Sequence, residues 1–340
     1  MKIKNLSMTL AALGLAFSAQ SSFAGSTLDA VKKKDVIACG VSTGLAGFSQ
    51  KDEKGNWSGL DVDVCRGVAA AVLGDASKVQ YKPLTAKERF LALQSGEVDL
   101  LSRNTTWTHT RDTSLGLNFA GVVYYDGAGF MVSNKLGVKS ATELDGANAC
   151  IQAGTSTELA IADYFRENKM NYKAITFDTA DQTRAGFESG RCDFLVSDQS
   201  QLYSLRIGLK NPSGAIVLPE VISKEPLGPV VRQNDDEWFN VVKWVVNASI
   251  EGEFQGVTSA NATDLRKNGK PGQKRLLGSE GDLGQKLGLS ADWAYQVIKQ
   301  VGNYSESFER NVGQGSPMKI ARGLNAQWNK GGILYSPAMR

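Results

Sequence analysis

The sequence predicts an α/β protein built from two lobes. Short apolar runs alternate with segments of helical periodicity along most of the chain, which is typical of β-α-β units around a mostly parallel sheet. The chain has 340 residues, a length that fits two domains better than one. Its hydrophobic fraction of 42% and charged fraction of 21% are ordinary for a globular protein. We therefore expect two lobes, each with its own core.

Glycines mark the ends of the helices expected in the first lobe. A helix over 61–73 should end at Gly74, and one over 86–95 at Gly96. Asp61, at the start of the first of these, is interpreted as its cap. The apolar runs 35–41, 79–82 and 99–102 are the expected strands. The second lobe repeats this order, with strands over 149–151, 175–177 and 194–196 and helices over 157–168, over 181–189 and from Ser200.

Two extended stretches, 128–132 and 228–232, are candidates for chain crossings between the lobes. If the chain crosses twice, the first lobe is discontinuous and takes back a helix over 235–250. A cleft then lies between the lobes, where ligands commonly bind. The remaining tail has helical patterns near 292–301 and 316–328 and should pack on the first lobe. The expected division is 25–129 for the first part of lobe one, 130–230 for lobe two, and 231–340 for the return to lobe one and a C-terminal helical extension.

Residues 1–24 are predicted to be a cleaved export signal. Lys2 and Lys4 precede an apolar run over 6–17, which is too short to span a bilayer, and 22–24 form a small-x-small cleavage site. Without a Cys at the cleavage point, a lipid anchor is not expected. The mature chain would keep a net charge of +1, because the signal carries two of the three excess positive charges. That charge gives no electrostatic case for nucleic acid, and we expect no membrane span downstream.

All four cysteines lie in the expected mature region, an even count in an exported protein. Three pairings are possible, and free buried thiols are the alternative. We favour Cys39–Cys65 and Cys150–Cys192, since each pair would stay within one lobe. A zinc site is not expected, because no C-x-x-C spacing occurs and the single histidine, His109, is interpreted as a surface residue.

Three short polar segments supply the chemistry needed to hold a free amino acid. The first, 104–111, offers hydroxyls and then Arg111, whose fork of donors matches a carboxylate. The second, 154–158, follows an expected strand and precedes a helix, so its amides should favour an anion. The third places Asp198 directly after a strand, where a carboxylate can receive an ammonium. No nucleophile–base pair is needed, so we expect a binding site with no catalytic residue, metal or cofactor.

Each of these segments also has a simpler interpretation. Arg111 could pair with the neighbouring Asp112 on the surface. Asp198 and residues 155–157 could cap the helices that follow them. Arg103 directly follows a strand and could be either a second cation of the pocket or a structural residue.

The mature chain resembles the periplasmic amino-acid-binding components of ABC importers. It is most similar to the general L-amino-acid-binding subgroup, with binders of glutamate, glutamine, aspartate and asparagine as near relatives. The resemblance implies a type II periplasmic binding protein fold, in which two lobes, each a mostly parallel sheet flanked by helices, are joined by two crossing strands. The stretches that carry it are 39–48, 59–66, 103–111, 190–193, 222–232, 303–304 and 322–325.

The resemblance also implies roles for individual residues. Arg111 would grip the ligand α-carboxylate, with the backbone amides of Thr106 and Thr155. Asp198 would hold the α-ammonium, with the Asn104 carbonyl and the Thr106 hydroxyl. Arg89 takes the position where acidic-amino-acid binders place an arginine that reads the side chain. The rest of the pocket would be lined by Thr157, Ser42 and Leu45. Leu45 and Ala86 stand where binders of basic amino acids carry aromatic residues, which argues against a dedicated arginine or lysine binder.

The function implied is delivery of free L-amino acids, polar and acidic ones included, to an inner-membrane ABC permease by a monomeric periplasmic protein. Cyclohexadienyl dehydratases resemble the same scaffold, so an enzyme of that kind is the alternative. It would need a general acid over the ligand, and Glu158 is the only carboxylate besides Asp198 that we can place near the cleft. A sensory module for a chemoreceptor would share the site and differ only in its partner.

Overall fold

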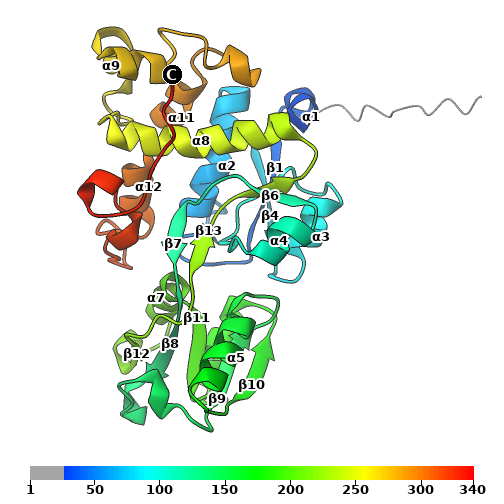
Figure 1. Cartoon of the computed structure of the whole chain (residues 1–340), viewed down its shortest axis with the longest axis vertical. Helices are drawn as coiled ribbons and strands as arrows, with labels where there is room; N and C mark the ends of the chain where they lie inside the picture. Colours follow the sequence, from blue (N-terminus) through cyan, green and yellow to red (C-terminus); the bar gives the residue numbers. More distant parts are fainter. Residues whose placement is uncertain (1–26) are drawn as a thin grey trace, which may run out of the picture.

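The structure is a computed structural model that describes residues 27–340. The expected export signal lies outside these residues. Two lobes lie one beyond the other along the long axis and are joined by a pair of strands (Figure 1). Each lobe holds one five-stranded sheet. This is the α/β, two-lobed architecture that the sequence predicts.

The sheet of lobe one is parallel at one end and antiparallel at the other. β4 and β5 both run parallel to β1, whereas β14 runs antiparallel to β5 and β6. The strand order is β4 (Val79–Leu84), β1 (Ile37–Ser42), β5 (Leu100–Leu101), β14 (Val230–Arg232) and β6 (Leu117–Phe119). The other elements of this lobe are α1 (Thr27–Lys34), α2 (Leu60–Leu73), α3 (Arg89–Gln94), α4 (His109–Ser114) and the short hairpin of β2 (Gln50–Lys51) and β3 (Trp57–Ser58).

Lobe two repeats the arrangement. β10, β9 and β11 are parallel, and β8 pairs antiparallel with β11 and β12. The strand order is β10 (Lys173–Phe177), β9 (Asn148–Gln152), β11 (Phe194–Asp198), β8 (Ala128–Ser133) and β12 (Ala215–Val217). The helices are α5 (Thr157–Glu167), α6 (Ala180–Glu188) and α7 (Gln199–Ile207). The loops at the carboxyl ends of β1, β5, β9 and β11 face the cleft.

Local signals explain where the helices begin and end. Gly74 takes the left-handed conformation with φ 70° and donates its N–H to Ala70, which ends α2 as expected. α3 is shorter than the expected 86–95 and begins at Arg89. The Glu88 carboxylate accepts hydrogen bonds from the N–H and hydroxyl of Thr85 at 2.9 and 2.8 Å, so residues 85–88 form a turn before the helix.

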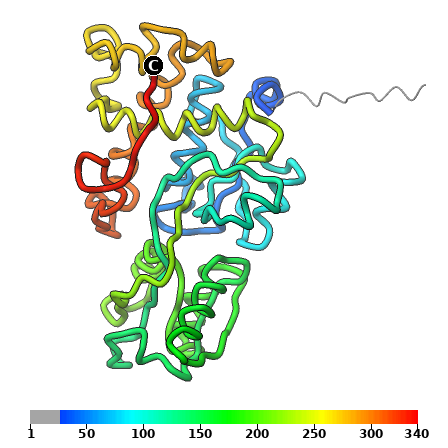
Figure 2. Tube along the Cα trace, in the orientation of Figure 1, coloured from blue at the N-terminus to red at the C-terminus, as the bar shows by residue number. Residues whose placement is uncertain are grey.

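The lobes are joined by a two-stranded antiparallel ribbon of β7 (Tyr124–Asp126) and β13 (Glu225–Leu227) (Figures 1 and 2). The expected crossing segments were therefore placed a few residues too late. Residues 128–132 form β8, an inner strand of lobe two, and 228–232 contain β14 of lobe one. An apolar extended stretch has the same sequence pattern whether it crosses between the lobes or pairs with other strands inside one sheet. The division into a first part of lobe one, lobe two and a return to lobe one stays a prediction, and its expected bounds at 129/130 and 230/231 fall inside β8 and β14.

The chain returns to lobe one as a long helix and continues as a helical extension. α8 is anchored by Trp238, which is buried and donates Nε1–H to the Asp99 carbonyl at 2.9 Å. Val68 of α2, Val245 of α8 and Val297 of α11 are buried in one core cluster, so the extension packs on lobe one as expected. Its helices are α8 (Asp236–Phe254), α9 (Ala262–Asn268), α10 (Pro271–Leu276), α11 (Trp293–Val301) and α12 (Tyr304–Asn311).

The expected helical segment over 316–328 is wrong. That region has only short 3₁₀ turns, one of them Gly323–Asn325. The side chain of Asn325 instead hydrogen-bonds both the N–H and the C=O of Tyr125 in the ribbon strand β7, at 2.7 and 3.1 Å. Contact with the ribbon overrides the helical pattern here.

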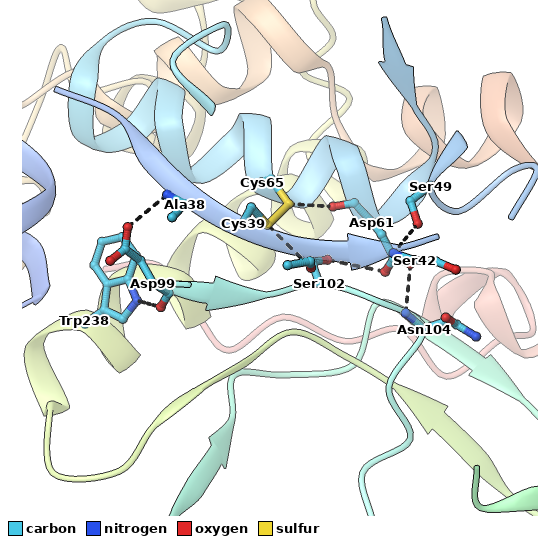
Figure 3. The surroundings of a disulfide bond; sticks show 11 residues. Ala38, Cys39, Ser42, Ser49, Asp61, Cys65, Asp99, Ser102, Asn104 and Trp238 are labelled. Atoms are coloured by element: carbon cyan, nitrogen blue, oxygen red, sulfur yellow. Dashed lines mark hydrogen bonds between the residues drawn. A yellow bond between two sulfur atoms is a disulfide. The ribbon is translucent and has the colours of Figure 1, made fainter. Parts of the chain in front are cut away.

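Both favoured disulfides are present. Cys39–Cys65 joins β1 to α2 (Figure 3), and Cys150–Cys192 joins β9 to the turn before β11. Each therefore fixes the strand that leads into the cleft. Among the helices of residues 27–340, none combines the length and the apolar character that a membrane crossing requires.

Candidate ligand-binding site

A narrow cavity lies between the two lobes. Its lining comes from residues that follow the carboxyl ends of strands in both sheets, the place where open α/β sheets bind ligands. Lobe one contributes Arg89, Arg103 and Asn104, and lobe two contributes Gln152, Thr155, Ser156, Thr157, Ser197, Asp198 and Gln201.

The lobes touch each other around this cavity. Lys87 and Asp178 form an ion pair at its exposed rim, with 2.7 Å between Nζ and Oδ1. Three further contacts cross the cleft: Arg89 Nη2 to the Gly154 carbonyl at 3.3 Å, Thr106 Oγ1 to Ser156 Oγ at 3.1 Å, and Asn104 Nδ2 to Gln201 Oε1 at 3.1 Å. The structure thus describes a closed arrangement of the cleft.

Asp198 supplies a buried carboxylate to the cavity. It stands at the N-cap position of α7, yet its side chain makes no capping hydrogen bond, so the capping interpretation is not supported. Asp126 of the ribbon takes that role instead and accepts from the Ser200 N–H at 3.3 and 3.4 Å. Burial raises the pKa of Asp198 well above its usual range, and the charges of Asp126 and Glu225 add to the effect, while Arg89 opposes it. A cation beside Asp198 would relieve this cost.

Arg89 supplies a guanidinium that is almost fully buried and under-bonded. It is 2% exposed, and its Nε has no hydrogen-bond partner within the described chain. Its Cζ lies 4.8 Å from the centroid of the Phe90 ring. Burial lowers its pKa well below the usual value, and the charges of Arg111 and Arg103 lower it further. An anionic group in the cavity would satisfy this side chain.

Arg103 and Asn104 are held in place from inside lobe one. Arg103 Nε donates to the Leu84 carbonyl at 3.0 Å, and burial lowers the Arg103 pKa to about 10. Asn104 has φ 33°, in the left-handed region that Asn tolerates better than most residues. Its N–H donates to Asp61 at 2.8 Å (Figure 3). Arg103 thus lines the cavity and also makes a structural hydrogen bond within lobe one.

Asp61 does not cap α2, contrary to expectation. The N-cap position is Gly59, which has no side-chain capping bond. The Asp61 carboxylate instead accepts from the Asn104 N–H and from the Ser102 hydroxyl at 3.3 Å (Figure 3). Burial raises its pKa to about 7, although the hydrogen bond from Asn104 and the charge of Arg103 act in the opposite direction. Asp61 is therefore an internal support for the cavity wall.

Arg111 lies beside the cavity and is not part of its lining. Its Nη1 donates to the Thr106 carbonyl at 3.0 Å, so the guanidinium turns toward the site and away from Asp112. Burial lowers the pKa of Arg111, and the charges of Glu225 and Asp198 partly compensate. The guanidinium is thus within electrostatic reach of Asp198.

The loop before α5 contributes Thr155 and Ser156 to the cavity lining. Ser156 is the N-cap residue of α5 but does not cap with its side chain; its hydroxyl donates to Glu225 at 2.7 Å. The Thr155 hydroxyl donates to the Gln152 carbonyl at 2.8 Å. Because the first-turn N–H groups of a helix have no intrahelical acceptor, they are available to an anion. Glu158 accepts from the Gly154 N–H at 2.8 Å and does not line the cavity.

The expected site residues divide into two groups. Arg89, Asn104, Thr155, Thr157 and Asp198 line the cavity, and Arg111 and Thr106 lie beside it. Ser42 is buried at the end of β1, and Leu45 lines a neighbouring inter-lobe groove. Sequence reasoning missed Gln152, Ser197 and Gln201. Gln152 and Ser197 lie at the carboxyl ends of β9 and β11. Because ligands of open α/β sheets bind at these strand ends, this position could have identified both residues from the sequence.

The chain belongs to the bacterial extracellular solute-binding proteins, family 3, whose model matches residues 37–257. It is 57% identical to the general L-amino acid-binding periplasmic protein of Rhizobium johnstonii, over 100% of both chains. It is 49% identical to the glutamate/glutamine/aspartate/asparagine-binding protein of Rhodobacter capsulatus, over 93% of this chain and 94% of that one. A solved periplasmic binding protein of an ABC transporter from Brucella ovis, with glutathione bound, superposes with a TM-score of 0.91 at 56% identity, and covers 93% of this chain and 100% of that chain.

Proposed function

We propose that this protein is the periplasmic substrate-binding component of an amino-acid ABC importer. It would bind free L-amino acids between its lobes and present them, as a monomer, to permease subunits in the inner membrane. Membership in the solute-binding family supports the class, and relatives that bind amino acids cover nearly the whole chain. Export to the periplasm rests on the signal expected at residues 1–24.

One observation carries the proposal. A buried acid, Asp198, and buried guanidiniums, Arg89 and Arg103, meet in one cavity between the lobes. An acidic amino acid brings an α-ammonium for Asp198 and a side-chain carboxylate for the guanidiniums. We assign the α-ammonium to Asp198, and the α-carboxylate to Arg111, which lies beside the cavity, and to the backbone N–H of Thr155. Each charge-assisted hydrogen bond contributes about 1.5–3 kcal/mol net. Three or four of them, less the cost of ordering the ligand and the site, are compatible with a binding free energy of about −8 kcal/mol, which corresponds to a micromolar Kd.

The proposal is tested by isothermal titration calorimetry with each of the twenty L-amino acids, after carried-over ligand has been removed. We expect binding of several polar and acidic amino acids, and little or none of arginine or lysine. Arg89→Ala should weaken glutamate and aspartate more than alanine, because Arg89 is assigned to the ligand side chain. Failure of every L-amino acid to bind would refute the proposal.

A second candidate ligand class is γ-glutamyl peptides. Glutathione, present in the Brucella ovis structure, carries a free α-carboxylate and α-ammonium on its glutamyl residue, so the same α-group site could hold it. The peptide part would need more room. The groove lined by Leu45, Ser204 and Leu205 lies one turn along α7 from Gln201 of the cavity. Competition between glutathione and glutamate in calorimetry tests this; simultaneous binding of both would count against a shared site.

We propose a binding role without catalysis. A dehydratase would need a general acid over the ligand. Asp198 is the only carboxylate among the described cavity residues, and it is assigned to the ammonium. Glu158 is engaged with the Gly154 N–H. Incubation with arogenate or prephenate and assay for aromatic product checks this, because turnover would overturn the binding-only role.

A further inference from the structure

A chain of side-chain hydrogen bonds runs along one wall of the cavity and crosses from lobe one to lobe two. Arg103 Nη1 donates to Asn104 Oδ1 at 3.3 Å, and Asn104 Nδ2 donates to Gln201 Oε1 at 3.1 Å. Gln201 Nε2 then donates to Gln152 Oε1 at 3.3 Å, and Gln152 Nε2 to the Asp178 carbonyl at 3.2 Å. The four side chains all line the cavity.

The two ends of this chain fix the orientation of every amide between them. Arg103 has only donors, and the carbonyl of Asp178 can only accept. Reversing any one of the three amides would place two donors or two acceptors against each other. Although amide oxygen and nitrogen are generally assigned from hydrogen bonds, the direction here is set by groups that cannot be reversed.

Each amide keeps hydrogen-bonding capacity for a ligand. A primary amide has two N–H donors and two acceptor lone pairs, and the chain uses one of each. Asn104, Gln152 and Gln201 line the cavity and are 8%, 5% and 5% exposed, so their spare donors and acceptors have little access to bulk solvent. These three amides are therefore neutral and offer donors and acceptors side by side, next to the Arg103 guanidinium.

We infer that the Asn104–Gln201–Gln152 amide chain reads the ligand side chain and makes one site accept both carboxylates and carboxamides. The inference rests on the proposed function and deepens it. A carboxylate wall would repel glutamate, and a wall of guanidiniums alone would leave the N–H groups of glutamine unpaired. Spare amide N–H groups suit either ligand oxygen, and spare carbonyl lone pairs suit the ligand amide. The α-groups are held separately, by Arg111 and Asp198.

The test compares the Kd values of L-glutamate, L-glutamine and L-alanine by calorimetry, with alanine as the ligand that has no polar side chain. Gln201→Met keeps a similar volume and removes the hydrogen bonds. It should weaken glutamate and glutamine relative to alanine by about 2- to 12-fold, the range for one ordinary hydrogen bond. Gln201→Glu adds a charge and should favour glutamine over glutamate by about tenfold or more. Gln152→Met repeats the first comparison at a second position if Gln201 variants do not fold.

Gln285→Glu is the matched control, since it makes the same change at an exposed position of the C-terminal extension. It should leave all three Kd values unchanged. A uniform weakening of all three ligands in the Gln201 and Gln152 variants would show that the amide chain only supports closure, and would overturn the inference alone. Absence of binding of all three ligands by the unaltered protein would overturn the proposed function as well.

Discussion

Glu225 and Asp126 lie directly opposite each other on the two antiparallel strands that join the lobes. Each reaches a helix start in lobe two: Glu225 accepts from the Ser156 hydroxyl before α5, and Asp126 from the Ser200 N–H in α7. The ribbon thereby holds both helices whose first turns face the cavity. Like charges on opposite residues are unfavourable, and burial together with Glu225 raises the pKa of Asp126. The ribbon is an acidic element next to the proposed ammonium position.

Arg111→Ala is expected to weaken every amino-acid ligand, because it removes a charge-assisted contact to the α-carboxylate that all ligands share. The loss should be about 10- to 100-fold, measured by calorimetry and by loss of ligand-induced thermal stabilisation. Arg166→Ala, at an exposed position of α5, is the control. If the Arg111 variant binds ligands with normal affinity, Arg111 does not contact the ligand and its assignment is wrong.

Ligand affinity should rise with pH through the titration of Asp198. Its pKa in the empty cavity is raised by burial and by Asp126 and Glu225, so below that pKa the ligand ammonium must displace a proton. Affinity should then fall by up to about tenfold per pH unit as the pH is lowered. Calorimetry in buffers of different ionisation enthalpy should detect the released proton. Asp198→Asn should bind weakly and without this dependence; a flat pH profile in the unaltered protein would contradict the assignment.

Asp61 should make the free energy of unfolding depend on pH. Its pKa is about 7 in the folded protein and 3.8 as the reference value, so between these values the folded state binds more protons than the unfolded chain. The contribution of Asp61 is therefore present at low pH and is lost as the pH rises toward 7, by about 1.4 kcal/mol per unit of pKa difference at most.

Asp61→Asn keeps an acceptor for the Asn104 N–H and removes the titration. Urea unfolding at several pH values should show that the unaltered protein loses stability relative to this variant as the pH rises. Asp163→Asn, at an exposed carboxylate of α5, should show no such trend. If the difference in the free energy of unfolding between the Asp61 variant and the unaltered protein stays constant over this pH range, the buried carboxyl does not titrate as described.

The disulfide of lobe two should stabilise that lobe. Cys150 and Cys192 are 42 residues apart in sequence, and a cross-link over such a loop contributes about 2–4 kcal/mol to the free energy of unfolding. The double variant Cys150→Ser, Cys192→Ser should unfold at correspondingly lower urea concentration. Ligand affinity at low temperature should change little, because neither sulfur lines the cavity.

Features with local causes could be predicted from the sequence, whereas contacts between distant residues could not. The end of α2 at Gly74 follows from one residue's conformational freedom. By contrast, the Asn104–Gln201 bond joins positions 97 residues apart, and Asp126 takes over the start of α7 from a distance of 74 residues. The position of Asp198 after a strand therefore predicts that it lies in the cavity. That its side chain does not cap α7 depends on Asp126, which no local sequence pattern indicates.

The same limit explains the errors in the tail and at the crossings. Residues 316–328 carry a weak helical pattern, and only the folded arrangement brings Asn325 to the ribbon. Arg111 was assigned from its place after a run of threonines, and the structure puts it next to the cavity lining because its guanidinium turns back to the Thr106 carbonyl. Side-chain direction of this kind depends on neighbours that come from other elements.

Asn325 has a consequence for how the two halves can separate. By bonding both backbone groups of Tyr125, it fastens β7 to the C-terminal extension, and Tyr304 does the same for Val123 through a 2.8 Å bond to its carbonyl. This part of the ribbon is thereby immobilised on lobe one. We expect lobe two to rotate about a pivot beyond Tyr125, near Asp126 and Gly127. An Asn325→Ala variant would move that pivot and widen the range of open forms, which small-angle X-ray scattering of the unliganded protein can measure.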